Sequence, residues 1–494
     1  MGSRDAREDA LRSRIAALPI AQQFWLGLGL VLVLFGSFLA TETFVVAAGF
    51  LAVIVGALIV RNPVRSIFAF ILCNVFLVLL AKPKFGGATP APTIVDYGFA
   101  LLFAAIIGFW IVRMRIIQAE PLSRSLPQLF INVFAVWGLL VTAIGFINGN
   151  NTLNSASREI LNLSPLLILP LLYERFIVPD SKTENRLLIT VFVLACGMLF
   201  WNYFKLRTGV ITVIATAQYG TPRGNSDETL AGLVTLFALS SLMSIRRGWR
   251  SWLLILLLVL ALGAVAISFA RTLYLATMAT MILLLFMSGR EERRRGLWRI
   301  FLAIITGTLF LIPIALNSRV IGFLISQYGT RLLAAQHLVT DLSLRARYAE
   351  WRGEWAAITH SLLNGYGFGA AFRYSDLLVG FDEWISFSHS SYLYIVFKTG
   401  FVGAVLFFTA YGLSIREGVK ILRDPTLSLR TKIVVRACVG YLVLILIYAY
   451  SAPVLDAKTD MVWVGLIWGY FLALSRRMRH ATLVEKLPFH AVIP

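Results

Sequence analysis

Long apolar runs recur along almost the whole chain and limit what it can fold into. Of its 494 residues, 58% are hydrophobic and only 14% are charged, and the mean hydropathy is +0.79. A soluble protein cannot bury this much apolar surface, so lipid must solvate it. About fourteen runs, of about 16 to 22 residues each, are long enough to cross a bilayer as a helix. The sequence therefore predicts an all-α integral membrane protein.

These runs also divide the chain into segments. We place the spans near residues 23–40, 43–60, 66–81, 97–112, 128–147, 160–174, 187–204, 229–245, 251–268, 273–289, 300–317, 391–414, 433–450 and 460–475. The resulting units are an N-terminal segment at 1–22, eleven spans within 23–317, one large loop at 318–390, three spans within 391–475 and a tail at 476–494. The first apolar run lacks an evident small-residue cleavage site, so we interpret it as an uncleaved first span.

Basic residues orient this stack of spans. Most of the 45 lysines and arginines fall on short connections that share a side with the N-terminus, such as 290–299 and 416–436. The positive-inside rule then predicts that both termini are cytoplasmic and that the 318–390 loop lies on the outer side. This orientation accounts for most of the net charge of +20. No soluble basic domain or stacking platform is visible, so we expect no nucleic-acid partner.

A histidine marks the point where the large loop re-enters an apolar run. Residues 387–393 read FSHSSYL, and His389 alone among the five histidines lies at such a boundary between small hydroxyl residues. An imidazole placed there can hold or pass a proton near neutral pH. A helix cap or a structural hydrogen bond is the alternative role.

Several basic residues lie on the outer side although the topology does not require them there. Arg271 belongs to a tight turn, SFART at 268–272, and is either a snorkelling side chain or a fixed cation at the edge of a cavity. Arg223 lies in the polar turn segment 219–228, before the eighth expected span. Lys398 lies about 10 Å into the span after His389, where we expect a structural ion pair.

Arg158 precedes an expected span that contains two prolines. Pro165 and Pro170 each remove a backbone donor, which predicts a bent or broken helix. Such a break is tolerated where the backbone lines a cavity, and a plain kink is the alternative.

The 318–390 loop is rich in aromatic residues and nearly balanced in charge. One stretch has apolar residues at helical spacing, with charged residues largely on the other faces: Leu344, Tyr348, Trp351, Trp355, Ile358 and Leu362 against Arg345, Arg352, Glu350 and Glu354. We expect a helix that lies on the membrane surface or packs onto the ends of neighbouring spans. The following NGYGFG segment at 364–369 has three alternating glycines, which permit a sharp turn or the close approach of a ligand.

Three of these segments, in this order, resemble the O-antigen ligase and polymerase superfamily of bacterial inner-membrane proteins. They are the turn at 268–272, the RYAEW helix at 347–351 with its downstream glycine segment, and HSSYL at 389–393 with Gly400 and Gly403. The resemblance covers roughly residues 220–410, whereas the N-terminal spans match only in general character. It implies a multi-helix, GT-C-like membrane glycosyltransferase with one large periplasmic loop and a periplasmic active site. The implied reaction transfers glycans from undecaprenyl diphosphate to an acceptor with inversion, without a metal or other cofactor.

The residues suit this chemistry. A leaving lipid diphosphate gathers negative charge that guanidinium groups can stabilise, and the candidates are Arg271, Arg223 and Arg347. By resemblance, His389 is the base that takes the proton of the acceptor hydroxyl. Further candidates for contact with the substrate or acceptor are Tyr392, Arg345, Tyr366 and Arg158. The three cysteines lie within apolar runs without CxxC or Cys/His spacing, and no metal-ligand cluster is visible.

The sequence leaves the acceptor open. A polymerase would use a second lipid-linked repeat unit, with a chain-length regulator as an implied partner, whereas a ligase would use lipid A-core. The balanced loop and the number of spans favour an O-antigen or exopolysaccharide polymerase. A flippase or transporter of lipid-linked glycans is the alternative of another class, and it predicts an internal repeat and charges along the membrane midplane. We find no such repeat, and the unusual polar residues gather at the outer rim.

Overall fold

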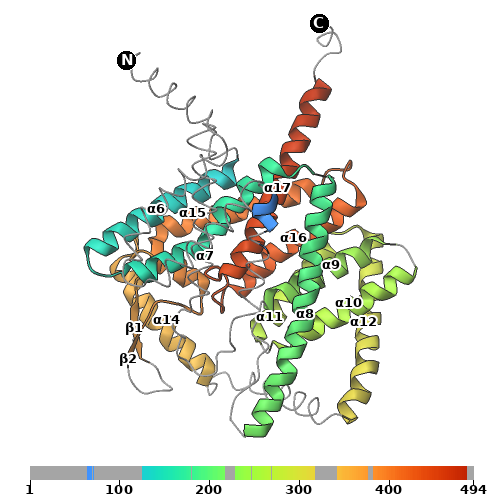
Figure 1. Cartoon of the computed structure of the whole chain (residues 1–494), viewed down its shortest axis with the longest axis horizontal. Coiled ribbons are helices and arrows are strands. Elements are labelled where there is room, and N and C mark those ends of the chain that lie inside the picture. The colour runs from blue at the N-terminus through green and yellow to red at the C-terminus, as the bar shows by residue number, and fades with distance from the viewer. Residues whose placement is uncertain are drawn as a thin grey trace.

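The computed structural model describes residues 64–68, 71, 125–179, 181–216, 228–245, 248–268, 270–317, 342–375 and 382–486. Over these residues the regular secondary structure is helical apart from one small two-stranded hairpin (Figure 1). The helices are α6 (Leu126–Ile147), α7 (Leu153–Phe176), α8 (Lys182–Thr216), α9 (Glu228–Ser244), α10 (Trp249–Ile267), α11 (Arg271–Phe286), α12 (Arg290–Asn317), α14 (Leu342–His360), α15 (Ser391–Leu422), α16 (Leu429–Tyr448) and α17 (Lys458–Lys486).

Every expected span from residue 128 onward coincides with one of these helices. Within the part of the chain that the structure describes, five stretches are long and apolar enough to cross a membrane: Leu126–Ile147, Lys182–Trp201, Trp249–Ala266, Ser391–Leu422 and Leu429–Tyr448. Shorter apolar helices are Thr229–Ser244 and Arg271–Phe286. The first four expected spans lie outside the described residues, apart from part of 66–81. The apolar helices confirm a multi-pass membrane protein.

Helix α7 passes through both of its prolines without a break, so of the bent or broken helix that the sequence predicted, the broken form is wrong. Pro165 cannot donate to the carbonyl of Leu161, four residues earlier. The Ser164 hydroxyl donates to this carbonyl instead, at 2.7 Å. A neighbouring side chain thus satisfies the backbone group that the proline frees.

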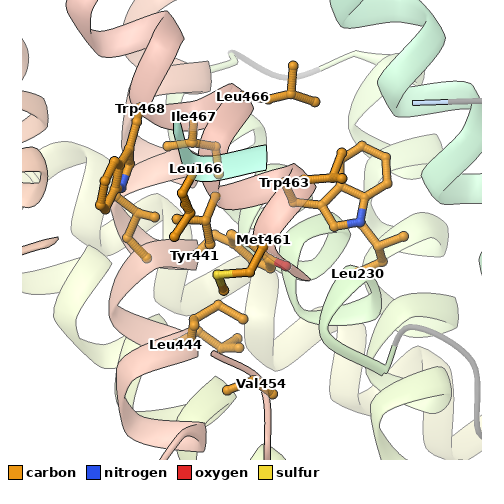
Figure 2. Packing of buried hydrophobic residues seen from close by; sticks show 14 of the residues in the cluster. Leu166, Leu230, Tyr441, Leu444, Val454, Met461, Trp463, Leu466, Ile467 and Trp468 are labelled. Atoms are coloured by element: carbon orange, nitrogen blue, oxygen red, sulfur yellow. The ribbon is translucent and has the colours of Figure 1, made fainter. Parts of the chain in front are cut away.

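Helix α17 packs closely against α7 through two glycines. A Cβ at Gly465 would lie 2.7 Å from the carbonyl oxygen of Pro165, and one at Gly469 would lie 2.4 Å from Tyr173 Cβ. Their four-residue spacing is the small-residue pattern by which membrane helices approach each other. Figure 2 shows the adjoining core, where Trp463 and Trp468 of α17 are buried.

Helix α15 is interrupted at Gly400, which has φ 67° and ψ −179°. A side chain there would lie 2.0 Å from the carbonyl oxygen of Leu363. The loop after α14 and a tryptophan of α6 satisfy the backbone groups that the break frees. The bonds run from Tyr366 N to Phe397 O, from Gly367 N to Lys398 O, from Phe401 N to Leu362 O and from Trp137 Nε1 to Thr399 O. The interruption therefore forms a hydrogen-bonded joint between α15 and the loop that follows α14.

The glycine segment that fills this joint turns sharply, as its sequence predicts. Gly365, Gly367 and Gly369 all have positive φ, between 71° and 86°. Backbone of α15, α6 and α7, respectively, lies within 2.6 Å of where a Cβ would stand on each of them. The close approach is thus made by the protein's own helices.

A two-stranded antiparallel hairpin follows, which the sequence did not predict. Strand β1 (Phe372–Ser375) pairs with β2 (Asp382–Ile385), with Phe372 opposite Ile385. In Figure 1 the hairpin and α14 lie away from the C-terminal end of α17. The chain leaves β2 four residues before His389, so the hairpin helps to place that histidine at the start of α15.

Candidate active site

The turn at 449–452, between α16 and α17, connects two of the segments that the sequence singled out. Ser391, at the start of α15, donates from its backbone N to Ala449 O at 2.9 Å and from its hydroxyl to Ala452 O at 2.7 Å. The hydroxyl of Ser451 in the same turn hydrogen-bonds to that of Thr272. Ser391 is two residues from His389, and Thr272 follows Arg271. The turn therefore brings the segments of His389 and Arg271 to one end of the helix bundle.

Helix α14 reaches the same turn through an aromatic contact. The rings of Trp351 and Tyr450 are 5.4 Å apart between centroids and meet edge to face. All three segments that carry the family resemblance thus converge on residues 449–452.

His389 is held by a buried carboxylate of α14. Glu350 Oε2 lies 2.6 Å from His389 Nδ1, and Glu350 Oε1 accepts from the His389 backbone N, also at 2.6 Å. The Glu350 side chain is only 5% exposed, whereas that of His389 is 40% exposed. A carboxylate bound at Nδ1 fixes the tautomer in which Nδ1 carries the proton. Nε2 then keeps its lone pair for a substrate proton.

A second carboxylate of α14 holds the residue before the histidine. Glu354 follows Glu350 by four residues, which puts both on one face of the helix. Glu354 Oε2 accepts from the Ser388 hydroxyl at 2.6 Å, and Ser388 Oγ accepts from Ser390 N at 3.0 Å. Burial raises the pKa of Glu354 to about 8, and the nearby Glu350 carboxylate adds to the rise. Glu354 is therefore mostly protonated at neutral pH and adds little negative charge beside Glu350.

Arg271 is the first residue of α11 and directly follows the tight turn from α10. Ser268 organises this turn: its hydroxyl donates to Val265 O at 2.8 Å and accepts from Ala270 N at 3.2 Å. The Arg271 side chain is half-buried and makes contacts of its own. The turn that the sequence predicted is confirmed. Arg271 directly precedes Thr272, whose hydroxyl contacts Ser451.

The other predicted site residues are placed differently. Arg347 is half-buried on α14, one helical turn before Glu350, while Arg345 on α14 and Arg158 on α7 are exposed. The hydroxyls of Tyr366 and Tyr392 donate to backbone carbonyls, of Ala357 at 3.0 Å and of Leu446 at 2.7 Å. Arg223 lies outside the described residues.

Lys398 forms a buried ion pair, as predicted. Its Nζ lies 2.8 Å from Glu159 Oε1 and donates to Ala370 O at 2.6 Å, and its side chain is fully buried. Glu159 Oε2 accepts from Gly369 N at 2.7 Å. The ion pair thus joins α15 and α7 to each other and to the glycine segment at 364–369.

Sequence reasoning missed Glu350 as the partner of His389, and it missed the turn at 449–452. Glu350 lies within the 347–351 motif, and its spacing to Glu354 was the available signal for a shared helix face. The turn itself, AYSA, carries no residue pattern that points to a site.

No group of three or more His, Cys, Asp or Glu residues that could hold a metal ion occurs among the residues that the structure describes.

Comparison with known proteins assigns the central part of the chain. Residues 256–408 match the family model described as O-antigen ligase. This range contains α11, α14, the hairpin and His389. A search of curated proteins finds no match. The family match supports the resemblance seen in the sequence: residues 256–408 are similar to the superfamily of O-antigen ligases and polymerases.

Proposed function

We propose that the protein is a bacterial inner-membrane glycosyltransferase that polymerises undecaprenyl-diphosphate-linked repeat units on the periplasmic face. The family match supports glycosyl transfer between lipid-linked glycans. The observation that supports a catalytic role for His389 most strongly is its contact with Glu350. This contact leaves the outer nitrogen of a partly exposed imidazole free to act as a base.

In the proposed reaction, an acceptor sugar hydroxyl attacks the anomeric carbon of the donor. A new C–O bond forms as the bond from that carbon to the phosphate oxygen breaks. The electron pair leaves with undecaprenyl diphosphate, and His389 Nε2 takes the proton of the hydroxyl. Glu350 stabilises the imidazolium that forms. Direct attack in one step inverts the anomeric configuration, and no metal is required.

Arg271, Arg223 and Arg347 are proposed to stabilise the diphosphate, because guanidinium groups bind phosphate oxygens in a bidentate manner. The contact of Thr272 with the turn at 449–452 supports this for Arg271, because Ser391 binds the same turn from the His389 side. For Arg347, support comes from its place one turn before Glu350 on α14. Arg345, Tyr366, Tyr392 and Arg158 stay candidates for substrate contact.

The proposed topology has about fourteen spans in a GT-C-like arrangement, with 318–390 periplasmic and both 1–22 and 476–494 cytoplasmic. One contact supports a shared cytoplasmic side for two basic connections. Arg436 Nη2, about two turns into α16, lies 2.7 Å from Glu292 Oε2 at the start of α12. The other end of α16 leads into the turn at 449–452 of the candidate site.

A ligase is the second candidate, because the matching family model is described as O-antigen ligase. The acceptor would then be lipid A-core. If the protein polymerises, a chain-length regulator is the proposed partner.

The proposal is tested with purified protein and lipid-linked repeat units in EDTA. We expect the wild type to make longer lipid-linked glycans whose new linkages have the inverted anomeric configuration. An Arg271→Ala variant that folds normally should make none. A parallel reaction with lipid A-core separates the two acceptors, because a ligase would label lipid A-core and leave the repeat units unextended. Absence of any glycan transfer to either acceptor would overturn the proposal.

A further inference from the structure

A row of aromatic rings lies on the surface beside the candidate site. Tyr348 and Trp351 of α14 are 5.5 Å apart between ring centroids, and Trp351 and Tyr450 are 5.4 Å apart. Both contacts are edge to face, with interplanar angles of 84° and 70°. Tyr348 and Tyr450 are each 59% exposed. The row therefore offers two accessible rings that a third ring holds in place.

The row is continuous with the catalytic segments. Trp351 directly follows Glu350, which holds His389. Tyr450 stands between Ala449, which accepts a hydrogen bond from Ser391, and Ser451, which contacts Thr272. The rings thus occupy the junction between the histidine and arginine segments.

Two exposed cations flank the row on α14. Arg345 precedes Tyr348 by three residues and Arg352 follows it by four, so both are neighbours of Tyr348 on the helix surface. For these two residues the sequence-based expectation of a separate charged face does not hold. Their guanidinium groups can donate hydrogen bonds to hydroxyl or carboxylate oxygens. A pyranose ring has a face formed by C–H groups and an edge that carries hydroxyls. The aromatic rings match that face, and the guanidinium donors beside them match that edge.

We propose that Tyr348, Trp351 and Tyr450 form a subsite that binds a pyranose ring of the acceptor glycan. The inference rests on the proposed function and specifies where its acceptor lies. The C–H face of the sugar packs on the negatively charged face of an aromatic ring. Because the rings are already held by one another, little conformational freedom is lost on binding. The subsite keeps the acceptor hydroxyl near His389.

A membrane-surface role for these rings is the competing explanation. Exposed tryptophans such as Trp252 and Trp298 lie near the starts of α10 and α12, beside the basic connections, as an interfacial belt predicts. The aromatic row differs from them, because it joins rings from two segments far apart in the chain and borders a buried carboxylate.

The test measures binding by isothermal titration calorimetry to full-length protein in nanodiscs. The probe is the oligosaccharide that mild acid releases from lipid-linked repeat units of the bacterium that makes this protein. We expect Tyr348→Ala and Tyr450→Ala each to weaken binding about three- to tenfold. Tyr348→Phe and Tyr450→Phe keep the ring and should bind like the wild type. Trp252→Ala is the matched control and should also leave binding unchanged.

Wild-type affinity in both alanine variants would overturn the subsite. A membrane-surface role predicts that the two alanine variants partition less into vesicles. Such a result together with wild-type affinity for the oligosaccharide would also overturn the subsite. Equal losses in the phenylalanine variants would overturn stacking as the mode of binding. His389→Ala separates this inference from the proposed function, because we expect it to bind the oligosaccharide normally without transferring it. Transfer by the wild type combined with unchanged binding in the alanine variants refutes the subsite alone.

Discussion

Two carboxylates tie helix α15 to neighbouring segments, and their surroundings differ. Glu350 holds His389 at the end of the helix, where the imidazole is 40% exposed. Glu159 holds Lys398 nine residues later, where the ammonium is fully buried. Each pair joins a carboxylate to a basic side chain, yet only the basic side chain of the first pair is partly exposed. Exposure of the partner thus distinguishes a pair suited to proton transfer from a pair that holds the fold together.

Replacing the carboxylate of the exposed pair should have the largest effect on catalysis. Glu350→Gln keeps the size of the side chain but cannot stabilise an imidazolium, so we expect kcat to fall by about 10² to 10⁴. The KM for the acceptor should change little. Steady-state kinetics with lipid-linked repeat units provide the measurement. A variant with wild-type kcat would show that Glu350 has only a structural role.

Breaking the buried pair should instead reduce stability. Lys398→Met leaves the Glu159 carboxylate buried without its cation, which costs on the order of 3 to 5 kcal/mol. The amount of folded protein that survives heating, measured by size-exclusion chromatography, should fall sharply. Adding Glu159→Gln should restore part of the loss, because the amide still accepts from Gly369 N. Lys420→Met, which changes an exposed lysine of α15, is the matched control. Equal behaviour of Lys398→Met and Lys420→Met would contradict the contrast between the two pairs.

A smaller effect on the pH dependence of stability is expected from Glu354. Burial raises the pKa of this carboxyl from 4.5 to about 8, although the Ser388 bond opposes the rise. The folded protein holds the proton more tightly than the unfolded chain, so this contribution to stability is complete below about pH 4.5 and is lost as the pH rises to about 8. Glu354→Gln imitates the protonated form and should flatten the fall in thermal midpoint between about pH 5 and 8. Glu417→Gln, which changes another serine-bonded glutamate, should leave that fall as it is. A slope that Glu354→Gln leaves unchanged would argue against a protonated Glu354.

The helices could be predicted from the sequence because a bilayer imposes length and apolarity on each run. The turn at 268–272 and the helix over Leu342–His360 were predictable for a similar reason, since charge and spacing mark them locally. The hairpin was not, because each strand has only four residues and lies within a polar loop. The unbroken course of α7 at Pro165 was also missed. There the Ser164 hydroxyl donates to the Leu161 carbonyl, which the proline leaves without its usual donor.

The candidate site was only partly predictable. The sequence singled out His389 and Arg271 by residue type and position at the membrane boundary. Their convergence depends on the turn at 449–452, whose contacts use backbone carbonyls and a serine hydroxyl. The partnership of His389 with Glu350 spans 39 residues of loop and hairpin, and no local pattern encodes such a contact.

The central claim is that His389 is the catalytic base, and the most direct test compares two histidine variants at saturating substrate. His389→Ala removes the base, whereas His360→Ala changes an exposed histidine at the end of α14. We predict that the rate of glycan extension falls by about 10² to 10⁴ in His389→Ala and stays at the wild-type level in His360→Ala. A folded His389→Ala variant that extends glycans as fast as His360→Ala would contradict the account.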